Sequence, residues 1–302
     1  MREPQADRSL KSRLFKAELG KSGKARKQAK LRNRQSAETG KVQKLAKRGN
    51  RKSAKTAKVW KQAKRKNSKS VETAGAWKQG ETMGEIKVGR MVFGMCQTNC
   101  YFLYREGEKQ TIVVDPADKG ANIYNALEKN GFQVAGILLT HGHFDHIWGL
   151  EELKTAANLA AQTAGREPVK VYAGEAERLL LNSPELNVSE RAGRACGVTA
   201  DVYVEDGDEI TLAGMTCQVI TTPGHTAGGC CYYFKEGGFL LSGDTLFAES
   251  VGRTDFPTGS MSELVRSIKE KLFLLPDDTK VYPGHGESTT IGHEKEYNPF
   301  CG

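Results

Sequence analysis

The spacing of apolar residues changes sharply near residue 83. Before that position, only twelve Leu, Val, Phe, Trp or Met residues are spread over 82 positions, and Ile and Tyr are absent. So little apolar surface cannot offset the entropy that a chain loses when it folds around a core. We therefore expect residues 1–82 to be a disordered, low-complexity tail. Residues 83–302 are expected to form one folded domain, for which their number suffices.

From residue 86 onward, short apolar runs alternate with turn signals. Runs of this length that are rich in β-branched and aromatic residues predict strands. Asp206-Gly207, Ala213-Gly214 and Gly237-Gly238 mark turns between them. The predicted strands cover residues 86–93, 101–104, 111–114, 134–140, 169–172, 202–205, 209–212, 216–221, 231–234, 239–242 and 280–282.

Three segments have the pattern of helices. Residues 147–164 are rich in Ala and Leu and stop before Gly165, and residues 175–181 are closed by Pro184. Residues 261–274 follow Ser260, which suits an N-cap, and carry apolar residues at four-residue spacing. Many strands with a few helices between them predict an α/β fold of two sheets covered by helices on the outside.

Charge divides the chain at the same place. Residues 1–82 contain 26 Lys or Arg against 6 Asp or Glu, whereas the remainder contains 19 against 30. Clustered Lys and Arg displace counterions from nucleic acids, so the tail is interpreted either as a polyanion-binding arm or as a passive solvated extension. A nuclear address or an atypical transit peptide also fits such a run. Met83 is an alternative start, in which case the tail is not part of the mature protein.

The apolar pattern favours no membrane partner. No run approaches the ~18–20 consecutive apolar residues that span a bilayer, and the N-terminus lacks the apolar core of a secretory signal. Seven cysteines are an odd number and do not suggest a disulfide framework, so we expect reduced thiols and a cytoplasmic location. The pairs Cys230-Cys231 and Cys96 with Cys100 are interpreted as packed strand residues. The oligomeric state stays open.

Five of the six histidines fall in motifs with Gly or Pro at the ends of predicted strands. A single histidine is usually structural, but this density calls for a chemical reason. His293 is the exception and is interpreted as a surface residue. The motifs are His141-Gly142-His143-Phe144-Asp145-His146, Pro223-Gly224-His225-Thr226, Gly243-Asp244-Thr245 and Pro283-Gly284-His285-Gly286.

The number of these donors predicts two metal ions. Imidazole and carboxylate suit Zn²⁺ and other borderline divalent metals. One catalytic zinc usually takes three protein ligands, so five histidines with Asp145 and Asp244 exceed one site and fit two if a carboxylate bridges. Zinc is the expected metal, and iron and manganese are the alternatives.

Taken in order, these motifs resemble those of the metallo-β-lactamase superfamily, over about residues 86–302. The resemblance implies an αββα sandwich with the metals at one edge. It also implies a supporting, non-ligating role for Asp115, in Val113-Val114-Asp115-Pro116. The implied ligands are His141, His143 and His225 for the first metal and Asp145, His146 and His285 for the second, with Asp244 bridging the two.

A further motif, Gly252-Arg253-Thr254-Asp255-Phe256, resembles the glyoxalase II-like (hydroxyacylglutathione hydrolase-like) branch. That branch hydrolyses thioesters, typically S-acyl-glutathione. Because the sequence continues only briefly after His285, we expect a member of this branch without the C-terminal helical domain of the longer enzymes. The resemblance implies that Arg253 clamps a substrate carboxylate, and a surface or supporting salt bridge is its alternative role.

Two divalent metals ~3.5–4 Å apart lower the pKa of a shared water, so the expected reaction is hydrolysis by a bridging hydroxide. Asp145 and Asp244 are the catalytic candidates, because one could orient that hydroxide and the other could bridge the metals. The alternatives are a mononuclear-iron persulfide dioxygenase, a phosphodiesterase that uses the tail as a nucleic-acid anchor, and an inactive binding protein.

Three other members of the superfamily fit less well. The usual β-lactamases are exported and lack the Asp-His pair with a bridging Asp. Flavodiiron proteins have Glu where this chain has His143. The nucleases that process messenger RNA carry a cap domain for which residues 83–302 leave no room.

Overall fold

A computed structural model describes residues 84–302. The predicted disorder of residues 1–82 and their contact with nucleic acid lie outside the described residues. Within residues 84–302, no helix is both long and apolar enough to cross a membrane.

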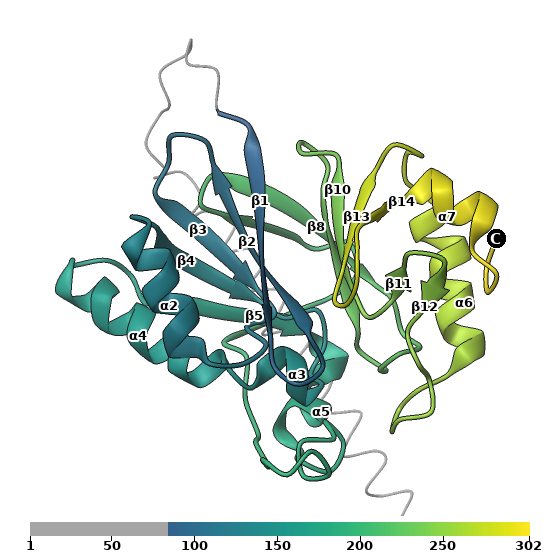
Figure 1. Cartoon of the computed structure of the whole chain (residues 1–302), viewed down its shortest axis with the longest axis horizontal. Helices are drawn as coiled ribbons and strands as arrows, with labels where there is room; N and C mark the ends of the chain where they lie inside the picture. The colour runs from purple at the N-terminus through teal and green to yellow at the C-terminus, as the bar shows by residue number, and fades with distance from the viewer. Residues whose placement is uncertain (1–83) are drawn as a thin grey trace, which may run out of the picture. The chain divides into compact units, whose positions relative to one another are not determined.

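The first sheet contains six strands in chain order and carries two helices, α2 (Gly120–Lys129) and α4 (Leu150–Thr163). The two helices cover the outer face of this sheet (Figure 1). Their apolar side chains, such as Ile123 and Leu153, pack there against Val113 and Ile137. From β3 onward the strands are parallel. The strands are β1 (Ile86–Phe93), β2 (Thr98–Arg105), β3 (Gln110–Val114), β4 (Gln133–Leu138), β5 (Lys170–Gly174) and β6 (Val202–Val204).

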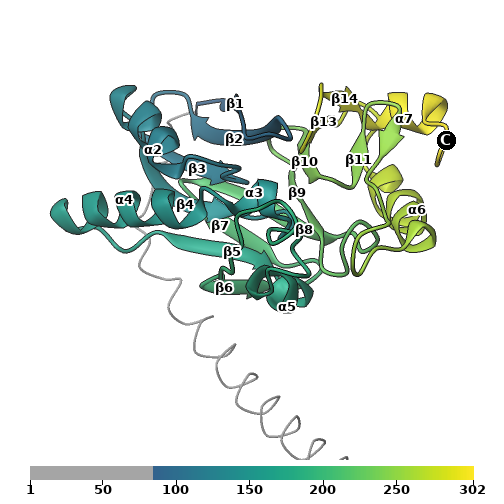
Figure 2. The same cartoon turned by 60° about the horizontal axis from the view of Figure 1, so that its bottom comes forward.

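The second sheet also has six strands, and its outer face packs against α6 (Met261–Glu270), η3 (Leu272–Leu274) and α7 (Ile291–Tyr297). Figure 2 shows these helices on the side opposite to α2 and α4. A small hairpin, β11 (Leu246–Phe247) and β12 (Ser250–Val251), follows the sheet's central strand. The order is β14 (Thr289–Thr290), β13 (Lys280–Pro283), β10 (Phe239–Gly243), β9 (Cys230–Phe234), β8 (Met215–Thr221) and β7 (Glu209–Leu212).

The inner faces of the two sheets enclose the main core. Leu103 of the first sheet and Tyr232 and Phe234 of the second are fully buried there. Because each sheet has apolar side chains on both faces, helices must cover the outer ones. The result is the αββα sandwich that the sequence predicts, with all eleven predicted strands present.

The helix prediction needs three corrections. The helix predicted over residues 147–164 begins only at Leu150, as α4, and a separate short helix, α3 (Phe144–Ile147), precedes it. Between them lies Gly149, whose N–H donates to the Pro116 carbonyl. Helix α2 was missed, since its N-cap Lys119 has a left-handed backbone and makes no side-chain cap. Helix α7 was missed too, because a helix of seven residues is too short to show a clear helical spacing of apolar residues.

Candidate metal centre

The candidate ligands lie at one edge of the sandwich, because each follows the carboxyl end of a strand. Strands β3 and β4 are parallel, and so are β10 and β13, so their ends meet at a common edge. This is the position where open α/β sheets usually hold their ligands. Asp115 follows β3, the His141–His146 segment follows β4, His225 follows β8, Asp244 follows β10 and His285 follows β13.

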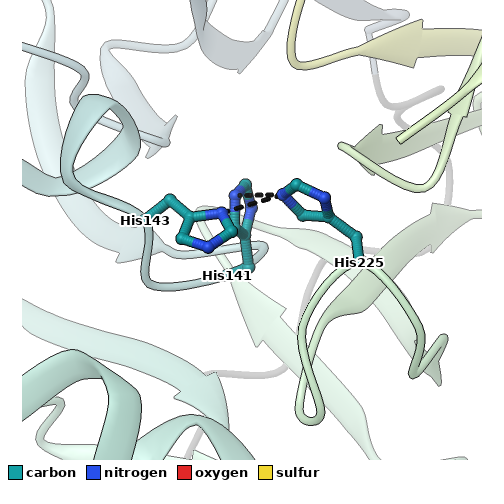
Figure 3. Close-up of side chains that lie close together, drawn as sticks. All are labelled: His141, His143 and His225. Carbon is teal, nitrogen blue, oxygen red and sulfur yellow. Dashed lines mark hydrogen bonds between the residues drawn. The ribbon is translucent and has the colours of Figure 1, made fainter. Parts of the chain in front are cut away.

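Three of the histidines form a buried triad. The exposed fractions of His141, His143 and His225 are only 2%, 3% and 4%. Nε2 of His225 lies 2.8 Å from Nδ1 of His143 and 3.2 Å from Nε2 of His141 (Figure 3). The three rings therefore point at one another, although His225 is 82 residues or more from the other two in sequence.

Hydrogen bonds orient two of these rings. Nδ1–H of His225 donates to the Arg253 carbonyl at 2.7 Å, since a carbonyl only accepts. The Thr140 hydroxyl uses its one proton to donate to Asp115. Its oxygen lies 3.1 Å from Nδ1 of His141 and therefore accepts a hydrogen bond from that Nδ1–H. In these neutral tautomers both Nε2 atoms carry lone pairs, and they face each other. The two lone pairs repel each other unless a cation lies between them. In histidine metal sites, one ring nitrogen binds the metal and the other donates a hydrogen bond, as Nδ1 does here.

The second half of the centre contains the carboxylates. Nε2 of His285 lies 3.3 Å from Asp145 Oδ2 and 3.4 Å from Asp244 Oδ2. Nε2 of His146 lies 3.4 Å from Asp244 Oδ1 and 3.7 Å from Asp145 Oδ2. Asp244 also approaches the triad, with Oδ2 at 3.5 Å from His225 Nε2. It therefore contacts both halves, as expected of a bridging group.

The pKa values of the two halves shift in opposite directions. Burial lowers the pKa of His143 to about 3 and holds that of His141 well below its usual value. Burial opposes protonation of His285 too, but hydrogen bonds to Asp145 and Asp244 raise the pKa of His285 to about 9. The first half thus presents neutral imidazoles, which is the form that binds metal. In the second half a bound cation would replace ring protons.

The donor set fits divalent metals. Nε2 of His146 and Oδ1 of Asp244 are buried, face the centre and have no hydrogen-bond partner. Buried polar atoms are normally satisfied, so each orphan needs an explanation. Three groups of these residues bring ligand atoms within 4.8 Å of one another: His141, His143 and His225; His141, His146 and Asp244; and Asp145, His146 and His285. The structure thus brings all seven predicted ligands together.

Asp115 lies behind the ligands, where the resemblance places it. Its carboxylate accepts hydrogen bonds from the Thr140 N–H at 2.8 Å and from His146 Nδ1 at 3.0 Å. Its φ of 49° is in the left-handed region, which is unusual for a residue other than Gly. Such backbone strain persists where the surroundings demand it, and here the carboxylate orients one imidazole and braces the loop that carries the others.

Several supporting groups were not predicted. The Thr98 hydroxyl donates to Asp145 Oδ2 at 2.8 Å, and His285 Nδ1 lies 3.1 Å from the Cys96 carbonyl. The next residue on β2, Asn99, donates from its side chain to the Pro283 and Gly286 carbonyls at 2.9 and 3.0 Å. The segment 96–99 therefore holds two ligands of the second half. Its polar pattern at the start of a strand was the only sequence signal.

The glycine before His285 allows this close approach. A Cβ on Gly284 would lie 2.3 Å from Asp244 Oδ1 and 2.7 Å from His146 Cε1. No side chain fits at these distances, so the Pro-Gly-His motif has a steric reason at this position.

Arg253 and His293 lie outside the ligand set. The Arg253 guanidinium is paired with Asp255 at 2.7 Å and lies 3.8 Å from the centroid of the Phe256 ring, while its carbonyl orients His225. The structure thus shows an exposed salt bridge between Arg253 and Asp255, and the role of Arg253 as a substrate clamp stays a prediction. His293 pairs with Glu249 at 3.1 Å, with 40% of its side chain exposed, in accord with a surface residue.

The family model described as "Metallo-beta-lactamase superfamily" matches residues 93–285. Among curated relatives, Hydroxyacylglutathione hydrolase GloC of Haemophilus influenzae is 33% identical over 211 residues, which are 68% of this chain and 92% of that protein.

Two solved structures share the fold. One is described as BLEG-1 B3 metallo-beta-lactamase and has a TM-score of 0.63 and 36% identity, covering 71% of this chain and 99% of that chain. The other, TTHA1623 in a di-iron-bound form, has a TM-score of 0.59 and 31% identity, covering 70% of this chain and 99% of that chain.

Proposed function

The chain belongs to the metallo-beta-lactamase superfamily, and its relatives make it a metal-dependent hydrolase. From this premise we propose that it hydrolyses thioesters of the S-acyl-glutathione type at a dinuclear centre. The single observation that supports two metals is the convergence of five imidazoles and two carboxylates at one edge of the sandwich.

The ligand roles follow the geometry of the two halves. The first metal would be held by the triad His141, His143 and His225, and the second by Asp145, His146 and His285, with Asp244 between them. We propose Zn²⁺, which suits a set of imidazoles and carboxylates. Iron is the alternative that the di-iron-bound TTHA1623 structure supports.

The protein's contribution to the reaction is orientation. Two bound divalent ions supply a water of lowered pKa and polarise the substrate carbonyl. Asp145, fixed by Thr98, has an oxygen directed at the centre that can accept a hydrogen bond from that water and aim it. Water adds to the thioester carbonyl and the carbon–sulfur bond breaks, so a carboxylic acid and a thiol are released. No protein nucleophile is required.

The thioester assignment depends on the branch of the superfamily. GloC is named a hydroxyacylglutathione hydrolase, and the Gly252–Phe256 motif lies beside the centre, where the Arg253 carbonyl orients His225. A substrate carboxylate could contact the Arg253 guanidinium only by sharing it with Asp255. We therefore propose the acyl-thioester as the reacting group and leave glutathione as the thiol to be tested.

A second candidate is β-lactam hydrolysis. It is favoured by one observation, the 36% identity to BLEG-1 over nearly all of that chain. The same attack on a carbonyl would open a β-lactam amide, so the proposed dinuclear centre could also support β-lactam hydrolysis.

The test is a metal analysis combined with a substrate panel. The full chain, purified without added metal and then loaded with Zn²⁺, is assayed with S-lactoylglutathione, a thioester lacking glutathione, nitrocefin and bis(p-nitrophenyl) phosphate. We expect two metals per chain and the highest kcat/KM on a thioester. About one iron per chain with oxygen consumption on glutathione persulfide would instead identify a dioxygenase, and preferential phosphodiester cleavage would identify a phosphodiesterase.

Two further expectations belong to this proposal. All seven cysteines are free in the structure, which supports a reducing, cytoplasmic location. Residues 1–82 are proposed as a nucleic-acid contact. Removing them should leave thioester turnover within a few-fold and abolish salt-sensitive binding to RNA or DNA.

A further inference from the structure

A buried carboxylate lies between the two loops that carry the triad. Glu177 ends the short helix η2 (Glu175–Glu177) after β5 and is fully buried, although it is not among the candidate ligands. Its Oε2 accepts a hydrogen bond from the Gly142 N–H at 3.2 Å. Its Oε1 accepts from the Gly228 N–H at 2.9 Å and from the Thr226 hydroxyl.

These three bonds connect both triad loops. Gly142 is the residue between His141 and His143, and Thr226 directly follows His225. One side chain therefore holds the backbone on either side of the contact in which Nδ1 of His143 and Nε2 of His225 lie 2.8 Å apart. No other described side chain hydrogen-bonds to both the 141–143 segment and the 226–228 segment.

The approach of the second loop to η2 is very close. A Cβ on Gly228 would lie 2.3 Å from the backbone nitrogen of Glu177, and a Cβ on Gly174 would lie 2.4 Å from the Gly228 carbonyl oxygen. Only glycine fits at positions 174 and 228, so the loop after His225 contacts the backbone of η2 directly.

Glu177 lies without a cationic partner among the described side chains. Among residues 84–302, no Lys, Arg or His forms an ion pair with Glu177, and burial raises the pKa of Glu177 against the effect of its three hydrogen bonds. A buried carboxylate without a cation is costly, but only a carboxylate offers two acceptor oxygens to these donors. Cations in the adjacent centre would offset this cost, which links the carboxylate to the metals.

We infer that Glu177 is a positioning residue that fixes the two histidine loops in the geometry of the first metal position. The inference depends on the dinuclear site proposed above, but not on the thioester substrate. When Glu177 is removed, the loops can separate and the three nitrogens no longer converge. Loss of an outer residue that orients metal ligands typically lowers metal affinity by about 10–100-fold.

Two variants and a matched control test this inference in the full chain. Glu177→Gln keeps an oxygen for Thr226 and Gly228 but turns an NH₂ towards the Gly142 N–H, whereas Glu177→Ala removes every bond. The control is Glu294→Gln, because Glu294 is equally buried and also accepts three hydrogen bonds, from Glu249, Thr289 and Asn298, yet touches neither loop.

The measurement is the affinity of each Zn²⁺ equivalent, from competition with a chromophoric chelator, together with the unfolding temperature of the metal-free protein. For the tighter equivalent we expect a loss of about 10-fold in Glu177→Gln and about 100-fold in Glu177→Ala, with less than about 2-fold in Glu294→Gln. If Glu177→Ala does not fold, the Gln variant decides alone.

Wild-type affinity in Glu177→Gln, or an equal loss of affinity in Glu294→Gln, would overturn the positioning role. Failure of the wild-type chain to bind two Zn²⁺ would overturn this inference and the proposed centre together. Absence of thioester hydrolysis in a chain that binds two metals would contradict only the substrate.

Discussion

The two halves of the centre differ in how far they are buried and in the kinds of side chain that they contain. In the first half, three imidazoles from loops after β4 and β8 are nearly inaccessible, and no carboxylate belongs to the triad. In the second half, two carboxylates face His146 and His285, and 27% of the His285 side chain is exposed. The first half is therefore suited to holding a metal, and the second to exchanging water and admitting substrate.

The residues that support the ligands of the two halves also differ in burial. The first half is held by the buried Glu177 and by the Arg253 carbonyl. The second half is held by the segment 96–99 at the turn between β1 and β2, where Cys96 is exposed. Because His285 is partly exposed and its supporting residue Cys96 lies at an exposed turn, we expect the metal of the second half to leave first on chelation. The variants below test this comparison.

The largest effect is expected for Asp244→Ala, because Asp244 contacts both halves. Its loss removes the carboxylate that is proposed to bridge the metals and the negative charge beside four imidazoles, so turnover should fall by at least about 1,000-fold. Metal content by mass spectrometry and kcat/KM are the measurements. A variant that keeps two metals and wild-type turnover would show that the halves do not share this ligand.

His285→Ala should affect only the second half. We expect metal content to fall from two to one and kcat by about 100-fold or more, because the shared water loses one of its cations. His293→Ala is the control, since His293 is paired with Glu249 on the surface and its loss should leave kcat within about 2-fold. An essential His293 with a dispensable His285 would show that the ligand assignment is wrong.

Thr98→Val is expected to have a smaller effect. It removes the hydrogen bond that holds Asp145 while keeping the volume of the side chain, so affinity for the second metal should fall about 10-fold. Thr98→Ser retains the hydroxyl and should restore most of that affinity. A merely structural role would lower the unfolding temperature of both variants without this difference in metal affinity.

The smallest effect is expected for Arg253→Ala, because the guanidinium is already engaged by Asp255 and only the backbone carbonyl orients His225. We expect kcat within about 3-fold of wild type. A rise in KM of about 10-fold for S-acyl-glutathione, but not for a thioester lacking glutathione, would instead establish Arg253 as the substrate clamp.

Much of the fold could be predicted from the sequence, because the spacing of apolar residues and the residues at turns are local signals. The eleven strands and the two covered sheets follow from them, whereas α2 and α7 lack the caps or length that make a helix visible. The candidate ligands could be predicted too, since they fall in short motifs that combine His or Asp with Gly or Pro at strand ends. Their roles as ligands stay predictions until a metal is measured.

The sequence alone determined which side chains are available for metal binding, while the tertiary structure decided what holds them in place. The rings of His225 and His285 are oriented by the carbonyls of Arg253 and Cys96, and every residue has a carbonyl, so no residue type marks these positions. Glu177 is 31 residues or more from every candidate ligand, and nothing in the sequence distinguishes it from other glutamates in short helices. Only the packing of β5 against two distant loops brings it to the centre, because hydrogen bonds depend on proximity in space and not along the chain.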